Sequence, residues 1–249
     1  MVKFDIYGNT GVITLNRPEK RNAIIPEMIK LLIEKLDQAE TDNNIKVLII
    51  SGEGSSFCSG ADLDYLHKIK DYSIIENKND SQNLANLYLK IYNFPKPTIA
   101  AVNGAAIAGG CGIATVCDFI IADKAKAKFG YTEVKIGFIP AIVSIFLIRK
   151  TGEGRARQLL ISGEIINASE AKEIGLADYL ADDALIEAKD FAKKLLNNSS
   201  DSMNATKKLI NNIANLNISE AVQYSINMNT ITRTTKDFRN GIEKFINRK

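Results

Sequence analysis

The stretch PTIAAVNGAAIAGGCGIATVC, residues 97–117, decides the fold of this chain because it carries no charge over 21 residues. That length is about what a helix needs to cross a bilayer. Its many alanines and glycines make it only weakly hydrophobic, however, which argues against a membrane span. A buried strand at 98–102 and a helix at 109–114, joined by a loop at 103–108, explain the pattern better. The sequence therefore predicts a strand, loop and helix inside an α/β core.

The same plan is predicted on both sides of this stretch. Alternating apolar residues, buried apolar runs and glycine or proline punctuation indicate the elements. They are a hairpin at 2–7 and 12–15, a helix from Pro26 to about Glu40, a strand at 46–51, a glycine and serine loop at 52–64, a helix at about 81–93 and a strand at 119–122. Strands that alternate with helices favour an α/β fold with a parallel sheet.

The second half of the chain reads as mostly helical. Helices are expected at 141–150, 154–160, 168–174, 183–196, 203–214 and 219–235, with one further strand at 176–180. The polar run Asn197 to Ser200 is the best linker, so the domains are expected to be a core at 1–198 and a helical region at 199–249. The last helices carry more apolar residues than a lone appendage could bury, so they should pack on the main body or on a neighbouring subunit.

Composition and charge exclude several classes of protein. The 249 residues are 45% hydrophobic and 24% charged, which is typical of a globular chain. A net charge of +3 without a basic stripe gives no sign of a surface that binds nucleic acid or an anionic membrane. Cys58, Cys111 and Cys117 suggest neither a disulfide framework nor a zinc site. With a charged start instead of a secretory signal, we expect a cytoplasmic protein that holds no metal.

Two glycine-rich loops, at 52–63 and 103–112, could bring backbone N–H groups to a ligand. Each follows a predicted buried strand, and a helix start would add a positive dipole to the donors. Together they could form an oxyanion hole, although from glycine content alone tight, well-packed turns in an α/β core are the simpler interpretation. Neither loop fits a dinucleotide-binding or phosphate-binding motif.

His67 is the only histidine in the chain. That count excludes most Ser–His–Asp, Cys–His and multi-histidine metal schemes unless this one residue serves. It follows the first glycine loop in what reads as a surface turn, so a solvated side chain is the simpler interpretation.

Glu133 is the carboxylate with the most unusual sequence setting. It lies in FGYTEVKIGFIP, residues 129–140, among apolar and aromatic residues. Burial there would raise its pKa, which suits a general base at neutral pH. A carboxylate at a turn, paired with Lys135, remains the alternative from sequence physics alone.

At this point the chain resembles the enoyl-CoA hydratase/isomerase (crotonase) family. The resemblance rests on FCSGADL at 57–63, on residues 97–118, on the Glu133 segment and on ASEAKEIGLA at 168–177. It extends from residues 6–8 and NRPEKRNA at 16–23 to NGIEKF at 240–245. It implies a spiral core of repeated ββα units, a helical C-terminal region used for trimerisation, and an acyl-CoA thioester substrate whose CoA makes any other cofactor unnecessary.

The resemblance also assigns roles to particular residues. Ala61 and Gly109 match the two positions whose backbone N–H groups polarise the thioester carbonyl, and Glu133 matches an acid/base. Arg21 and Ala23 match positions near the CoA phosphates and adenine, although an ordinary surface arginine explains Arg21 as well. The full set expected to bind substrate is Arg21, Ala23, Ser59, Asp62, Leu63 and Gly112. Phe245 and Lys249 would approach the CoA of a neighbouring subunit.

One position departs from the best-known pattern of the family. Hydratases with two glutamates hold water between a residue matching Glu133 and another at the position of Gly112. A single carboxylate suffices for Δ3,Δ2-enoyl-CoA isomerisation, whereas the run at 133–141 looks like single-glutamate hydratases of the methylglutaconyl-CoA type. Hydration is therefore expected first and isomerisation second. A non-catalytic acyl-CoA-binding protein and a serine protease on the same spiral fold are the alternatives from other classes.

Overall fold

A six-stranded sheet lies at the centre of the computed structural model, which describes residues 1–247 except the side chain of Phe245. The expected role of Phe245 and Lys249 therefore falls outside the described residues. The strand order is β1-β2-β3-β5-β7-β10, and only β1 and β2 pair antiparallel. The strands are β1 (Val2–Tyr7), β2 (Thr10–Leu15), β3 (Val47–Gly52), β5 (Thr98–Val102), β7 (Phe119–Asp123) and β10 (Tyr179–Ala181).

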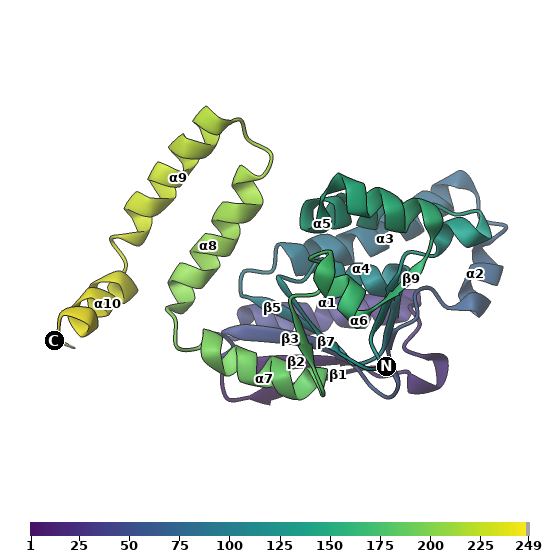
Figure 1. The fold of residues 1–249 in the computed structure, drawn as a ribbon, viewed down its shortest axis with the longest axis horizontal. Helices are drawn as coiled ribbons and strands as arrows, with labels where there is room; N and C mark the ends of the chain where they lie inside the picture. The colour runs from purple at the N-terminus through teal and green to yellow at the C-terminus, as the bar shows by residue number, and fades with distance from the viewer. Residues whose placement is uncertain (248–249) are drawn as a thin grey trace.

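The central strands are buried on both faces. In β3, Val47 and Ile49 face one side and pack with α7 (Ala184–Leu195), while Leu48 and Ile50 face the other side. This alternation is the two-residue period of a strand. Because both sides are covered by protein, such strands read as continuous apolar runs, and the sequence predicted them for that reason. In Figure 1, α7 lies below the sheet and most other helices of the body lie above it.

A second sheet of four short strands, ordered β4-β6-β8-β9, was missed from the sequence. Its strands are β4 (Ser56–Cys58), β6 (Ala105–Ile107), β8 (Lys128–Gly130) and β9 (Ile165–Asn167). The first two lie in segments predicted as loops, and that prediction was wrong, since three residues are too few to show a periodic pattern. Each of β4, β6 and β8 follows a long strand and precedes a helix, so the expected repetition of ββα units is confirmed.

The helices of the body agree with the predicted ones in place more than in length. They are α1 (Pro26–Thr41), α3 (Ile74–Tyr92), α4 (Gly109–Thr115), α5 (Ala141–Ser162) and α6 (Ala168–Glu173). A further helix, α2 (Leu63–Ile69), had no predicted counterpart. α3 starts earlier than expected because Ser73 and Glu76 form a capping box. α5 covers two predicted helices, and Gly152, with φ 77°, interrupts it at the predicted break.

Residues 97–117 fold as β5, β6 and α4 inside the body. Over the described residues, none of the helices is both long and apolar enough to span a membrane.

The C-terminal helices α8 (Ser200–Ile213), α9 (Ile218–Thr232) and α10 (Lys236–Ile246) form an arm that leaves the body after α7 (Figure 1). The linker at 197–200 separates α7 from α8 as expected, whereas α10 had no predicted counterpart. Whether the arm is a separate domain remains a prediction.

Lys207 connects this arm to the sheet. Its Nζ lies 2.7 Å from Asp118 Oδ2 and 3.2 Å from the carbonyl oxygen of Lys96, and its side chain is buried. Asp118 also accepts hydrogen bonds from the backbone N–H and hydroxyl of Thr98. The ion pair therefore fixes α8 against β5.

We predict that Lys207→Met lowers the free energy of unfolding by about 2 kcal/mol, because it leaves a partly buried carboxylate without its cation. The melting temperature should fall by about 4–8 °C. Lys208→Met, at the exposed neighbouring position, is the matched control and should change it little. Equal melting temperatures for the two variants would contradict the prediction.

Candidate active site

Three parallel strands of the small sheet end side by side, and the expected catalytic residues follow them. Cys58 of β4 pairs with Ala106 of β6, and Ile107 of β6 pairs with Gly130 of β8. The carboxyl ends of parallel strands meet at one edge of a sheet. Hence the segments that carry Ala61, Gly109 and Glu133 all leave from the same edge.

The first loop is held by the segment that precedes α1. The Ser59 N–H donates to the Arg21 carbonyl, the Ile24 N–H to the Gly60 carbonyl and the Asp62 N–H to the Ile24 carbonyl, at 2.7–3.1 Å. Ile24 and Ala61 form an isolated parallel bridge. Within residues 1–247 the Ala61 N–H takes no part in these bonds, so it can donate to a ligand.

The second loop turns sharply into α4. Ala108 has φ 48° and ψ −124°, a strained conformation for a residue with a side chain, and its N–H donates to the Gly130 carbonyl at 2.7 Å. Gly109 is the first residue of α4, so its N–H has no acceptor within the helix. Within residues 1–247 the Gly109 N–H is therefore unpaired, and it lies at the positive end of the α4 dipole.

The two loops are in contact, and glycine makes that possible. A Cβ added to Gly60 would lie 3.0 Å from Ala108 Cβ and 3.7 Å from the Gly109 nitrogen. A Cβ on Gly110 would lie 2.2 Å from the Cys58 carbonyl oxygen, which no real side chain tolerates. The structure therefore brings the Ala61 and Gly109 segments together, and their role as an oxyanion hole stays a prediction.

Glu133 begins the short 3₁₀ helix η2 (Glu133–Ile136) after β8, and only 9% of its surface is exposed. Its Oε2 atom is buried and has no hydrogen-bond partner among the described residues. Burial raises the pKa of this carboxyl group. The alternative of a turn carboxylate paired with Lys135 is wrong, since no ion pair joins Glu133 to Lys135 within residues 1–247.

The Asp62 side chain is engaged by the protein itself. It caps α2 by accepting from the Asp64 and Tyr65 N–H groups, and its Oδ2 lies 3.1 Å from Arg17 Nη2. Burial alone would raise the pKa of Asp62, but Arg17 and the two backbone donors hold it below the usual value. Arg17, which was not among the predicted site residues, also donates to the Ala23 carbonyl. This arginine fixes the first loop.

The remaining residues expected to bind substrate lie around these loops. Arg21 is exposed with φ 51°, Ala23 is buried, Ser59 is half-buried and Leu63 is 79% exposed. Gly112 lies buried in α4. The exposed Arg21 side chain fits an ordinary surface arginine and a phosphate contact equally well.

The other nucleophile and base candidates do not form a catalytic group. His67 is exposed on α2, so the predicted surface position is confirmed and the predicted turn is wrong. Its Nε2 lies 3.4 Å from Lys70 Nζ, which does not fit a Ser–His–Asp triad. Burial raises the pKa of Cys58 and Cys111 to about 12, so both thiols stay protonated at neutral pH.

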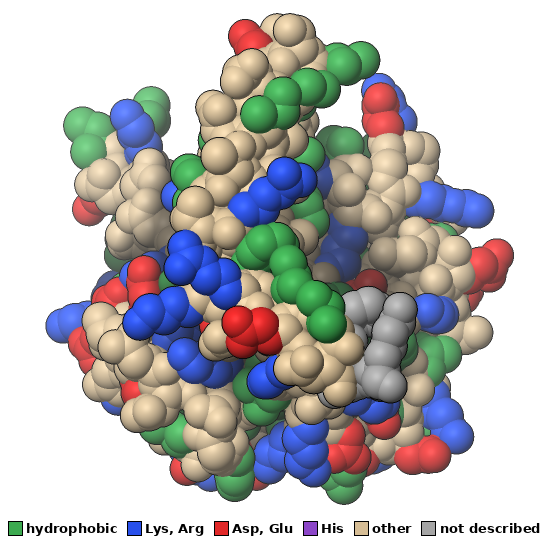
Figure 2. All heavy atoms as spheres, turned by 90° about the vertical axis from the view of Figure 1, so that its left-hand side faces the viewer, with side chains coloured by type: hydrophobic (Ala, Val, Ile, Leu, Met, Phe, Trp, Pro, Cys, Tyr) green, Lys and Arg blue, Asp and Glu red, His purple; other side chains and the backbone are tan. Residues whose placement is uncertain are grey.

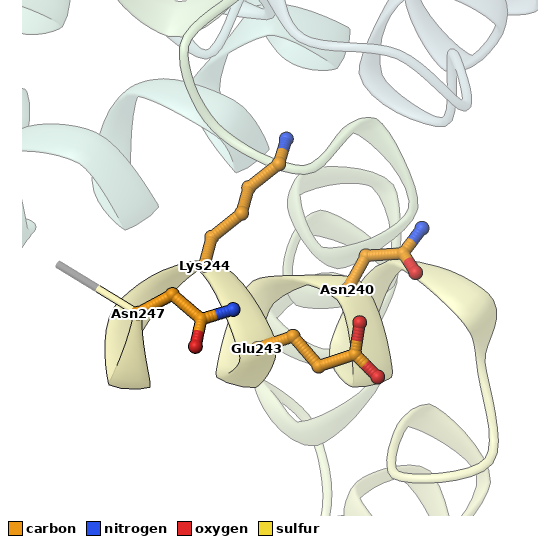
Figure 3. A pocket seen from close by; sticks show the side chains of 4 residues that line it. All are labelled: Asn240, Glu243, Lys244 and Asn247. Atoms are coloured by element: carbon orange, nitrogen blue, oxygen red, sulfur yellow. The ribbon is translucent and has the colours of Figure 1, made fainter.

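A surface hollow along α10 is unrelated to this site. Figure 3 shows its four lining residues: Asn240, Glu243 and Lys244 on α10, and Asn247 directly after that helix. α10 lies at the far end of the arm from α4 (Figure 1), and the hollow contains none of the residues described above.

Comparison with known proteins gives one consistent result. A family model described as enoyl-CoA hydratase/isomerase matches residues 5–249. A protein of Thermus thermophilus is 38% identical over 97% of this chain and 96% of its own length. The 2,3-dehydroadipyl-CoA hydratase of Escherichia coli is 32% identical over 96% of this chain and 92% of its own. The crystal structure of an enoyl-CoA hydratase from Polaromonas sp. JS666 is 31% identical, covers 100% of this chain and 97% of its own, and superposes with a TM-score of 0.94.

Proposed function

Because the chain belongs to the enoyl-CoA hydratase/isomerase family, we propose that it adds water to an enoyl-CoA thioester with Glu133 as the acid/base. The Ala61 and Gly109 N–H groups would hold the thioester oxygen. The observation that carries the proposal is the buried, unpartnered Glu133 oxygen at the sheet edge from which both donor segments leave.

The proposed reaction conserves protons. Glu133 takes a proton from water as the water oxygen bonds to the β-carbon. The double-bond electrons then move onto the thioester oxygen to form an enolate. Glu133 then returns the proton to the α-carbon as the enolate collapses. The negative charge develops on the thioester oxygen, where two preorganised backbone donors stabilise the transition state most. On this scheme the electrophile is the protein backbone, and we propose that no cofactor beyond the substrate's CoA takes part.

Isomerisation is the second candidate, and Gly112 is the observation that favours it. Glu133 would take a proton from the α-carbon of a Δ3-enoyl-CoA and return it to the γ-carbon through the same enolate. That route needs only one proton carrier, and it needs no bound water. A non-catalytic acyl-CoA-binding protein would have no use for the buried carboxylate of Glu133, whose desolvation is costly.

Incubation in deuterated water with crotonyl-CoA and, separately, 3-hexenoyl-CoA tests the proposal. We expect 3-hydroxybutyryl-CoA carrying deuterium at the α-carbon, detected by mass spectrometry. Conversion of 3-hexenoyl-CoA to 2-hexenoyl-CoA without hydration of either substrate would replace hydration by isomerisation. Recovery of both substrates unchanged would contradict both reactions.

We also propose that the protein forms a trimer or a dimer of trimers. Along α8 and α9, Ile210, Ile218, Val222, Ile226 and Ile231 are each more than half exposed. Figure 2, which views the side from which the arm projects, shows apolar side chains on its surface. Burying them would stabilise an assembly. Sedimentation at micromolar concentration should give a trimer or hexamer, and a monomer alone would contradict the proposal. We also propose a cytoplasmic location, which the three buried cysteines support because none of them forms a disulfide within residues 1–247.

A further inference from the structure

Tyr88 on α3 contacts the start of α4. It is 1% exposed, and its ring packs edge-on against Phe146 with centroids 6.4 Å apart. Its hydroxyl donates a hydrogen bond of 2.8 Å to the carbonyl of Gly109. Tyr88 therefore holds the 109–110 peptide, which directly follows the peptide that carries the Gly109 N–H.

The same side chain fills the space above Gly112. A Cβ added at position 112 would lie 2.3 Å from Tyr88 Oη, 2.6 Å from its Cζ and 3.1 Å from its Cε2. Real Cβ atoms do not approach other atoms closer than about 3.0 Å, so even alanine there would displace the ring. Phe146 and the hydrogen bond to Gly109 both oppose such a displacement.

The Tyr88 hydroxyl remains a donor at neutral pH. Burial above all, together with the nearby Cys58 and Glu133 groups, holds the pKa of Tyr88 well above its usual range. A protonated phenol keeps the hydrogen bond to Gly109 throughout the pH range in which Glu133 titrates.

We propose that Tyr88 is a positioning residue that fixes the Gly109 donor and keeps position 112 free of any side chain. Glu133 then works without a carboxylate from α4. The kinetic part of this inference rests on the proposed function, because it takes the Gly109 N–H as an oxyanion donor. The steric part rests on the packing of Tyr88 against Gly112 alone.

A double-mutant cycle on stability tests the steric part. Gly112→Ala should lower the melting temperature of the native chain by about 4–10 °C, as overpacking does. Tyr88→Leu removes the three atoms that the added Cβ meets and keeps the position apolar. In that background Gly112→Ala should no longer lower the melting temperature, because the atoms that the Cβ would meet are gone and helix propensity favours alanine.

Gly154→Ala is the matched control for the cycle. Gly154 lies in α5 with nothing within 4 Å of an added Cβ, so alanine should be accepted in both backgrounds. An equal loss for Gly112→Ala with and without the Tyr88 ring would overturn the proposal, as would no loss in the native chain.

Tyr88→Phe tests the hydrogen bond to Gly109. We expect kcat to fall about tenfold while KM stays within about twofold, because a misplaced donor weakens the transition state more than the bound substrate. Tyr92→Phe is the control on the same helix. Its ring also packs on Phe146, at 5.1 Å, but its hydroxyl makes no hydrogen bond within the described part of the chain, so kcat should not change.

The two readouts separate failure of this inference from failure of the proposed function. A native protein that converts neither enoyl-CoA would remove the proposed function, and the melting-temperature cycle would still decide the role of Tyr88. An active protein in which Tyr88→Phe retains full kcat would leave the function standing and overturn the positioning role.

Discussion

Glu133→Gln is expected to lower kcat about a hundredfold or more and to leave the affinity for the CoA ester nearly unchanged. Glutamine keeps the size of the side chain and removes its ability to accept and return a proton, which general acid–base catalysis requires. A group that acts only in the chemical step affects kcat and kcat/KM together, with little effect on ground-state binding. Steady-state rates with crotonyl-CoA, and titration of a non-reactive acyl-CoA, measure the two quantities.

Glu153→Gln is the matched control for this variant. Glu153 is exposed on α5 and pairs with Arg157 at 2.7 Å, so the same substitution there removes a carboxylate from the surface. Its kcat should equal that of the native protein. Equal activity of Glu133→Gln and Glu153→Gln would remove Glu133 from the mechanism.

We expect kcat to rise with pH as the buried Glu133 carboxyl group loses its proton. Glu133 must be ionised to accept the first proton, and burial raises its pKa above the usual glutamate value of about 4.3. As pH rises through this raised pKa, the ionised fraction grows, so kcat should increase and then level off. The midpoint should lie above about 4.3 and be absent from the residual rate of Glu133→Gln. A rate that is flat down to pH 4 would contradict the assignment.

The sequence predicted the long elements well because their physical signals are long. β3 and β5 are buried on both faces and so appear as unbroken apolar runs, and α1 presents a helical apolar stripe. The strands of the second sheet have three residues each, which is too short for a period to appear. In α10, Phe238, Ile242 and Ile246 repeat every fourth residue, but Gly241 weakens the helical signal.

Only part of the candidate site could be predicted from the sequence, for the same reason. The glycine loops and Glu133 could be found from the sequence because each has an unusual local composition. The sequence could not show that these segments leave from one sheet edge, because that arrangement depends on the pairing of β4, β6 and β8 across about 70 residues. Tyr88 gave no signal at all, because a tyrosine on the apolar stripe of a helix resembles any other core aromatic. Its hydroxyl acquires a role only through contact with Gly109, 21 residues away.

Ala61→Pro is expected to lower kcat by about a hundred- to a thousandfold, which corresponds to roughly 3–4 kcal/mol of barrier for one lost oxyanion donor. Proline removes the backbone N–H. The folded chain does not use that N–H within residues 1–247, and the bonds that hold the loop run through the Gly60 carbonyl and the Asp62 N–H, which both remain. The melting temperature should therefore fall much less than the rate.

A proline at another exposed position separates loss of the donor from the general effect of the ring. Lys236 is the first residue of α10, where a proline is tolerated because the N–H has no partner within the helix. Lys236→Pro should keep full kcat. If Ala61→Pro is folded by circular dichroism and as active as Lys236→Pro, then Ala61 does not stabilise the enolate. If it is folded and inactive, the free N–H of an exposed loop residue has a catalytic role that its packing alone does not reveal.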